Sequence, residues 1–222
     1  MISGKAVRST LADLADPRAA ALIIVDLQND FCAANGLWHQ RGHSLTGITS
    51  VVANTADLVA HARHAGVKII FIQMVMLPNA ASLSPAYLRF IATKTGLAPD
   101  QMGCELGSWG AEIIAALAPE PGDIIVQKWR SSAFLGTNLE LILRGAGVET
   151  VIVCGAATYA CVESTIRDAF NKDFYVIEVE DCVGGFNQDL HEASLQIMRS
   201  RIDVIPRKML IDVWQGLGVD PD

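Results

Sequence analysis

The sequence AALIIVDLQNDF, residues 20–31, contains the feature that decides the fold. Its first part, Ala20–Val25, is entirely apolar, and Asp26 follows directly. An unbroken apolar run of this length is typical of a central strand in a parallel sheet, which is buried on both faces, whereas a half-exposed strand alternates apolar and polar residues. The run therefore predicts a buried strand with a carboxylate at its carboxyl end.

Outward from this strand, apolar runs alternate with segments of helical periodicity. The first helix is predicted at residues 48–65, with Thr46 as its cap and Gly66 as its stop. The later strands are expected at 68–76, 123–127, 150–154, 175–179 and 202–205, and the later helices at 109–117, 139–145, 161–171, 189–200 and 208–217. This order predicts an α/β fold with a parallel sheet. Residues 77–107 fit the alternation least, and we expect them to form an excursion that covers a site.

Composition indicates a globular protein whose partners are small molecules. The 222 residues fit a single domain, 1–222, and the content of 51% hydrophobic and 18% charged residues favours a well-packed fold. The net charge of −7 disfavours nonspecific binding to nucleic acid or to an anionic membrane, since both attract clustered Lys and Arg. No apolar segment reaches the roughly 18 to 20 residues that cross a bilayer, and residues 1–17 lack the apolar centre of a signal peptide. We therefore expect a cytoplasmic protein.

Three side chains with chemical potential lie next to the predicted strands. Asp26 ends the first strand, Lys128 ends the strand at 123–127, and Cys161 follows a loop of small residues and begins a helix. Ligands of open α/β sheets bind beyond the carboxyl ends of the strands, so these residues are expected at one edge of the sheet. Together they supply a base, a charge stabiliser and a nucleophile whose thiolate is favoured by the helix amides.

Each of these residues also has an ordinary structural explanation. Free cysteines most often pack as small hydrophobes, and Asp26 is suited to capping a turn. A redox role for Cys161 would need Cys154 or Cys182 to approach it in space, because the five cysteines include no CxxC pair. His191, near the start of a predicted helix, is an alternative base for Cys161, although the sequence identifies no group that would orient its ring.

Three motifs resemble those of the isochorismatase-like cysteine hydrolases. They are VDLQNDF at 25–31, KWRSSAFLGTNLELIL at 128–143 and GAATYACVESTIRDAF at 155–170, and the resemblance covers most of the chain. It implies a three-layer α/β sandwich with a mainly parallel six-stranded sheet flanked by helices. It also implies a homo-oligomer, either a dimer or a tetramer, and a catalytic triad of Asp26, Lys128 and Cys161, the same residues that their positions singled out.

The resemblance further implies how a substrate is held. The oxyanion hole would consist of the backbone amides of Ala157 and Cys161, with a cis peptide bond between Ala156 and Ala157. The chain departs from the family pattern at Ala156, where a branched residue is common, and at Tyr159, where Asn, Asp or Ser is common. Residues that flank the triad in sequence are candidates for substrate binding: Gln28, Phe31, Trp38, Trp129, Arg130 and Tyr159. Among these, Arg130 is suited to pairing with a substrate carboxylate.

The expected activity is hydrolysis without a metal or another cofactor. Nicotinamidases of this family place a metal cluster of Asp and His after the second strand, and residues 73–84 contain neither type. The segments LSPAYLRF at 83–90 and GSWGAEII at 107–114 look like those of ureidoacrylate amidohydrolases and related carbamoyl-cleaving enzymes. We expect a cysteine-dependent amidohydrolase that cleaves the C–N bond of a small linear amide or ureido/carbamoyl compound through an acyl-enzyme. The alternatives are an isochorismatase-type hydrolase of another small substrate and a noncatalytic binding protein on the same fold.

Overall fold

A parallel sheet forms the centre of the molecule in the computed structural model, which describes residues 1–95, 97–98 and 101–216. The strands are β1 (Ala20–Val25), β2 (Lys68–Met74), β3 (Ile124–Lys128), β4 (Thr150–Ala156), β5 (Tyr175–Gly184) and β6 (Asp203–Ile205). They are ordered β3-β2-β1-β4-β5-β6, and each neighbouring pair is parallel. The predicted six-stranded sheet is confirmed, and β1 lies at its centre as its continuous apolar run indicated.

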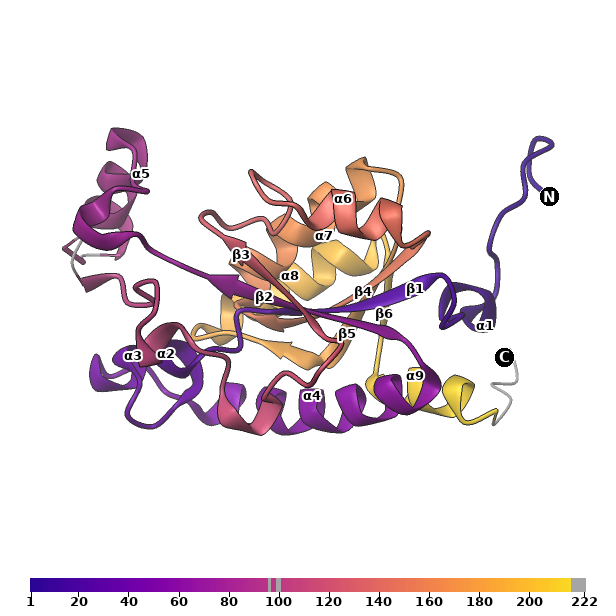
Figure 1. Cartoon of the computed structure of the whole chain (residues 1–222), viewed down its shortest axis with the longest axis horizontal. Coiled ribbons are helices and arrows are strands. Elements are labelled where there is room, and N and C mark those ends of the chain that lie inside the picture. The colour runs from indigo at the N-terminus through magenta and orange to yellow at the C-terminus, as the bar shows by residue number, and fades with distance from the viewer. Residues whose placement is uncertain (96, 99–100, 217–222) are drawn as a thin grey trace.

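Helices cover both faces of the sheet (Figure 1). One face carries α4 (Thr46–Ala65) and α9 (Arg207–Trp214), and the other carries α6 (Leu139–Gly145), α7 (Glu163–Asn171) and α8 (Gln188–Arg199). Side chains of β1 alternate between these layers, since Leu22 and Ile24 join the core on the α4 side while Ile23 and Val25 join the opposite core. The predicted three-layer sandwich is therefore confirmed.

Short helices gather at the end of the sheet where β1 and β2 finish (Figure 1). They are α2 (Asn29–Cys32), α3 (Leu37–Gln40) and α5 (Pro85–Phe90), whereas α1 (Leu11–Leu14) lies at the opposite end. α5 belongs to the predicted excursion at 77–107 and continues into a π-helical turn, Ile91–Thr95. Short helices and turns, and not long regular helices, thus cover the end of the sheet that carries the candidate residues.

The segment at 109–117 does not form the helix that its apolar spacing predicted. It consists of two separate 3₁₀ turns, Trp109–Ala111 and Ala115–Leu117. Its backbone groups bond to the chain that follows β1: the Asn29 amide donates to the Glu112 carbonyl at 2.9 Å, and the Ile114 amide donates to the Leu27 carbonyl at 3.0 Å. Because these groups are paired outside the segment, they are not available for a continuous helix.

Several predicted boundaries also move. β5 extends to Gly184 instead of residue 179. After a shift in the register of the two strands, Val183 and Gly184 pair with the last two residues of β4. α7 begins at Glu163, since Cys161 lies in a preceding π-helical turn, Thr158–Val162. α4 ends at Ala65 with Gly66 as its C-cap, as predicted, but Thr46 is its first residue and not its N-cap. α9 ends at Trp214, and residue 217, where the last helix was expected to end, lies outside the described residues.

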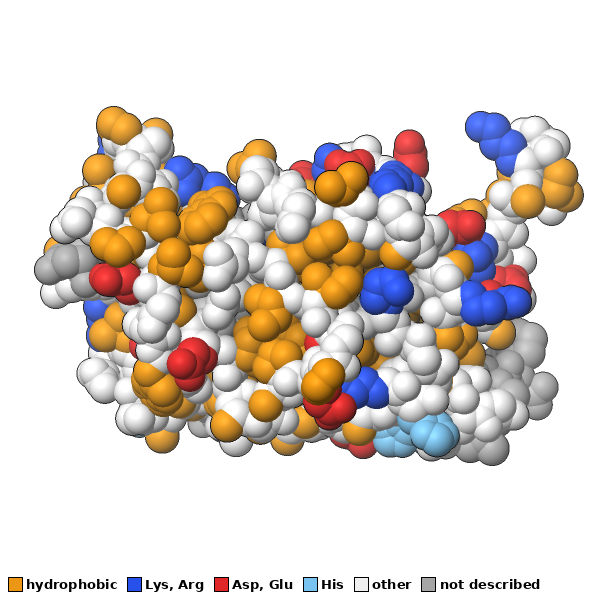
Figure 2. All heavy atoms as spheres, viewed as in Figure 1, with side chains coloured by type: hydrophobic (Ala, Val, Ile, Leu, Met, Phe, Trp, Pro, Cys, Tyr) orange, Lys and Arg blue, Asp and Glu red, His pale blue; other side chains and the backbone are white. Residues whose placement is uncertain are grey.

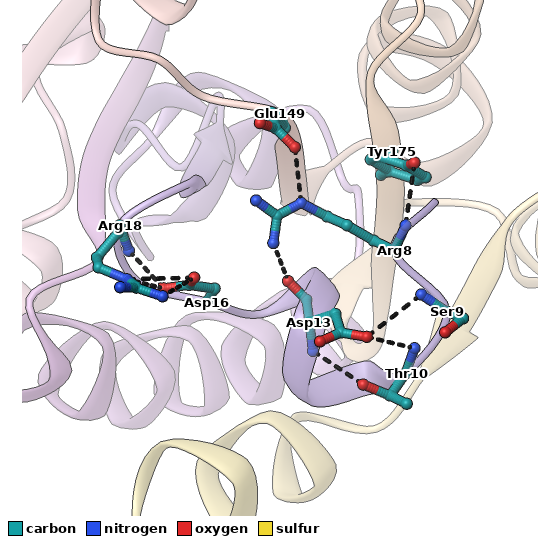
Figure 3. A network of polar contacts seen from close by, with 8 residues as sticks. All are labelled: Arg8, Ser9, Thr10, Asp13, Asp16, Arg18, Glu149 and Tyr175. Atoms are coloured by element: carbon teal, nitrogen blue, oxygen red, sulfur yellow. Dashed lines mark hydrogen bonds and ion pairs between the residues drawn. The ribbon is translucent and has the colours of Figure 1, made fainter. Parts of the chain in front are cut away.

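The amino-terminal segment is fastened to the far end of the sheet (Figure 3). The Arg8 amide donates to the Tyr175 hydroxyl at 3.2 Å, and Arg8 Nε donates to Glu149 Oε2 at 2.8 Å. Tyr175 begins β5 and Glu149 directly precedes β4, so these contacts lie away from the carboxyl ends of the strands. Within the described part of the chain, no helix is long and apolar enough to span a membrane.

Candidate active site

Asp26, Lys128 and Cys161 meet at the carboxyl end of the sheet. Lys128 Nζ lies 2.8 Å from Asp26 Oδ2 and 3.3 Å from Cys161 Sγ. The same ammonium donates to the Arg130 carbonyl at 2.9 Å. The side chains of Lys128 and Asp26 are 0% and 2% exposed, so this ion pair is fully withdrawn from water. The structure brings together the three residues that the sequence analysis selected.

The strand order explains how these residues meet. β1 and β4 are neighbours at the centre, so Asp26 and the loop after β4 are adjacent, but β3 is an edge strand separated from β1 by β2. Lys128 pairs in register with Met74 of β2, and its ammonium passes 3.5 Å from the Met74 sulfur on the way to Asp26. The four-carbon stem of a lysine spans this strand, which a shorter cation could not do.

Burial controls the protonation of the triad. It raises the pKa of the Asp26 carboxyl, against the opposing attraction of Lys128. It raises the pKa of the Cys161 thiol to about 12, again with Lys128 opposing the shift. Burial lowers the pKa of the Lys128 ammonium, but attraction to Asp26 and Cys161 outweighs it, so the pKa is raised. Burial therefore favours the thiol form of Cys161.

A buried carboxylate oxygen without a hydrogen-bond partner among the described residues lies in the same site. Asp26 Oδ2 is engaged by Lys128, while Asp26 Oδ1 makes no hydrogen bond with the described residues. Asp26 has a positive φ of 53°, a conformation that Asp tolerates better than most residues, and its amide donates to the Ile72 carbonyl at 3.0 Å. The open oxygen of a buried carboxylate with a raised pKa is suited to accepting the thiol proton.

The loop after β4 has the backbone features that the resemblance implied. The peptide bond between Ala156 and Ala157 is cis. Gly155 has a φ of 122°, and a Cβ at this position would lie 2.1 Å from the Val25 carbonyl oxygen, so only glycine fits there. Ala157 and Cys161 both line the cavity above the triad.

A cavity of about 250 Å³ opens onto Asp26 and Cys161. Aromatic rings form much of its wall: Phe31, Trp38, Tyr87, Phe90, Tyr159 and Phe186. Sulfur-containing side chains form another part: Met74, Met76, Met102 and Cys104. Because several of these residues come from 77–107, that excursion covers the cavity as predicted.

Half of the candidate substrate-binding residues lie on the cavity wall and half do not. Phe31, Trp38 and Tyr159 line it. Gln28 is fully buried below it, where its side-chain amide donates to the carbonyls of Met74 and Ala111 at 2.8 Å each. Its position flanking Asp26 in sequence thus reflects a structural role in joining two backbone segments.

Trp129 and Arg130 are half-buried and are not among the described residues that line the cavity. The Arg130 guanidinium lies 4.6 Å from the centre of the Tyr87 ring and donates to the Trp129 carbonyl at 2.6 Å. It therefore supports the outer side of a wall residue by a cation–π contact.

Several wall residues escaped the sequence analysis. Tyr87, Phe90 and Met102 lie in the irregular excursion, where aromatic residues with no periodic role were the only available signal. Phe186 was missed because β5 was expected to end earlier; its ring stacks on Trp38 with centroids 4.8 Å apart. Both omissions concern positions that depend on tertiary contacts.

His191 does not face the thiol. Its Nδ1 lies 2.8 Å from Thr158 Oγ1, and His191 is absent from the cavity wall as described, so the alternative Cys–His pairing is not formed. Cys154 and Cys182 are buried in the core on the α4 side of the sheet. Among the residues that the structure describes, no three His, Cys, Asp or Glu side chains are grouped so as to hold a metal ion.

Comparison with known proteins identifies the family. Residues 20–207 match the model of the isochorismatase domain. The chain belongs to the isochorismatase family. It is 37% identical over 169 residues to a ureidoacrylate amidohydrolase RutB of Variovorax paradoxus (strain S110), covering 73% of this chain and 67% of that protein. It is 36% identical over 188 residues to the enzyme of the same name from Methylobacterium radiotolerans, covering 81% and 73%.

Solved structures give the same result for the fold. A cysteine hydrolase from Pseudomonas syringae pv. phaseolicola 1448A superposes with a TM-score of 0.81 and 26% identity, covering 98% of this chain and 100% of that one. The shared fold therefore includes the excursion and the terminal helices as well as the sheet.

Proposed function

We propose that this protein is a cysteine-dependent amidohydrolase, a single hydrolase domain that cleaves the C–N bond of a small linear amide or ureido/carbamoyl compound. Its class, a hydrolase acting on carbon–nitrogen bonds other than peptide bonds, is supported by its amidohydrolase relatives. The observation that carries the mechanism is the contact of one buried ammonium, Lys128, with both Asp26 and Cys161 beside a cavity.

The first half-reaction forms the acyl-enzyme. Asp26 accepts the proton of the Cys161 thiol, and the sulfur attacks the substrate carbonyl carbon. The oxyanion that forms accepts hydrogen bonds from the amides of Ala157 and Cys161. The C–N bond then breaks, Asp26 returns the proton to the departing nitrogen, and ammonia or an amine leaves a thioester on Cys161.

The second half-reaction regenerates the enzyme. Asp26 takes a proton from a water molecule, the hydroxide attacks the thioester carbonyl, and the sulfur leaves with the proton that Asp26 held. Lys128 remains an ammonium throughout, because its charge holds Asp26 in place and balances the negative charge that moves between the carboxylate, the sulfur and the oxyanion.

The proposal includes a cytoplasmic homo-oligomer, a dimer or a tetramer. Exposed apolar residues offer contact area on the β3 side of the molecule: Ile125, Leu135 and Leu141 are 49%, 60% and 76% exposed. Figure 2 shows hydrophobic side chains gathered near the centre of the face on which β3 lies in Figure 1.

The test is ammonia release from primary amides and ureido compounds, with a chelator present throughout. Wild type, Cys161→Ser and the control Cys182→Ala would be assayed together, since Cys182 is a buried thiol in the opposite core. We expect turnover by wild type and the control and at least about 100-fold less by Cys161→Ser. Equal turnover by Cys161→Ser would refute the nucleophile, and silence of correctly folded wild type across the panel would refute the proposed activity.

A further inference from the structure

The cavity above the triad is almost without charge. Of the described residues on its wall, Asp26 alone carries a charged side chain, and no Lys, Arg or His lines it. The other polar side chains on the wall are the thiols of Cys161 and Cys104, the hydroxyls of Tyr87, Tyr159, Thr95 and Ser131, and the indole N–H of Trp38, which has no hydrogen-bond partner among the described residues. These groups are neutral donors and acceptors, so they suit the polar atoms of an uncharged ligand.

Two cations that contact residues of the cavity wall, Lys128 and Arg130, have partners within the protein. Lys128 contacts Asp26, Cys161 and the Arg130 carbonyl. The Arg130 guanidinium packs on the Tyr87 ring, and Arg130 is not among the wall residues described. The residues outside the described part of the chain, 96, 99–100 and 217–222, include no Lys, Arg or His in their sequence. No Lys, Arg or His among the described residues therefore forms part of the cavity wall itself.

A carboxylate in this cavity would lose its hydration without gaining a partner. Burying an unpaired charge among aromatic rings and thioethers is far more costly than burying a neutral amide, whose polar atoms the available hydroxyls can satisfy. Asp26, which must be ionised to act as the base, would add like-charge repulsion.

We propose that the substrate is an electrically neutral amide or ureide whose non-reacting part is an uncharged apolar group, and not an amino-acid-like compound with a carboxylate. This inference rests on the proposed function. It separates this chain from its RutB relatives, whose name specifies ureidoacrylate, a compound that carries a carboxylate.

Matched substrates test the inference directly. Hexanamide and adipamate (6-amino-6-oxohexanoate) present the same primary amide on the same chain length and differ in ending with a methyl group or a carboxylate. We expect kcat/KM for ammonia release to be at least about 100-fold higher for hexanamide, because an unpaired buried charge is strongly rejected. Equal values, or a preference for adipamate, would overturn the inference. So would adipamate turnover that disappears in Arg130→Gln, because it would place Arg130 on the substrate.

A designed cation gives the converse test. Phe90 is on the wall yet 46% exposed, so Phe90→Arg adds a positive charge at the cavity without burying it fully. Ala92→Arg is the matched control, because Ala92 is exposed on the adjoining turn and is not among the wall residues described. We expect Phe90→Arg, and not Ala92→Arg, to raise kcat/KM for adipamate by about 10-fold relative to hexanamide.

Binding measurements distinguish failure of this inference from failure of the proposed function. Calorimetric titration of Cys161→Ala with hexanamide and with adipamate reports the preference of the cavity without any chemistry. Binding of hexanamide with at least about 10-fold weaker adipamate binding supports a neutral ligand even where wild type releases no ammonia. Tighter binding of adipamate would refute the neutral substrate while leaving a cysteine amidohydrolase intact.

Discussion

Replacing Lys128 with methionine tests the central feature of the site. The substitution keeps a long unbranched side chain but leaves the Asp26 carboxylate 2% exposed without the ammonium that lies 2.8 Å away. Removing one partner of a buried ion pair costs about 3–5 kcal/mol, because the remaining charge stays buried or must take up a proton. Since domains are stable by about 5–15 kcal/mol, we expect Lys128→Met to fold with a much lower free energy of unfolding.

The same change should remove the base. Without Lys128 the main attraction that opposes the effect of burial on Asp26 is lost, so its pKa rises further and less of the carboxyl is ionised to act as a base. We expect kcat/KM for ammonia release to fall at least about 100-fold.

A double-mutant cycle separates pairing from general damage. Asp26→Asn, Lys128→Met and the double variant would be compared by urea denaturation and by ammonia release. Because the double variant leaves neither charge unpaired, its loss of unfolding free energy should be smaller than the sum of the single losses by about 2 kcal/mol or more. Strict additivity, or single losses below about 1 kcal/mol, would refute the argument that these charges are mutually dependent.

Three further predictions follow from individual residues. The acid limb of the kcat/KM profile should lie above the ordinary aspartate pKa, because burial raises the pKa of Asp26, and a limb at or below that value would contradict this role. Gly155→Ala should strongly lower both activity and the free energy of unfolding, because the added Cβ would collide with the Val25 carbonyl. The control Gly145→Ala, whose Cβ would have nothing within 4 Å, should leave both unchanged, and ammonia-release assays and urea denaturation of the two variants measure the difference. Glu178 is fully buried, neither of its oxygens has a hydrogen-bond partner among the described residues, and its pKa is raised to about 8. A carboxyl with a raised pKa contributes stability that is fully present below about pH 4.5 and is lost as the pH rises through 8. The free energy of unfolding of Glu178→Gln should therefore be a few kcal/mol higher than that of wild type at pH 9 and equal to it at pH 4.5. Equal pH dependence of the two unfolding free energies would contradict this.

The strands could be predicted because their signal is local. β1 is apolar at every position since both of its faces meet a helical layer, and that property needs no knowledge of the neighbouring strands. The prediction of a helix at residues 109–117 was wrong for the opposite reason, because hydrogen bonds of this segment go to residues 27–29, which are far away in sequence. The end of β5 was missed likewise, since the polar Glu180 and Asp181 precede the residues that rejoin β4.

The triad could be located for a related reason. Parallel strands bring their carboxyl ends to one edge of the sheet, so Asp26 and Cys161 were expected at the same edge whatever the strand order. The order itself was not predictable from residue patterns, and it determines that Lys128 crosses β2. The rise in the pKa of the Cys161 thiol was also hidden, because it depends on how deeply the loop after β4 is covered.

The cavity wall depends on the same first motif as the base. Asp30, four residues after Asp26, accepts a hydrogen bond from the Cys104 amide at 2.6 Å, and a Cβ on Gly110 would lie 2.1 Å from its carboxylate. This carboxylate therefore anchors the end of the excursion against α2. Because the excursion is held at that end, its residues before Met102 can change the size and polarity of the cavity without displacing Asp26 or Lys128. The excursion thus contributes one part of the cavity wall, and Phe31, Trp38, Tyr159 and Phe186 contribute another part from outside it.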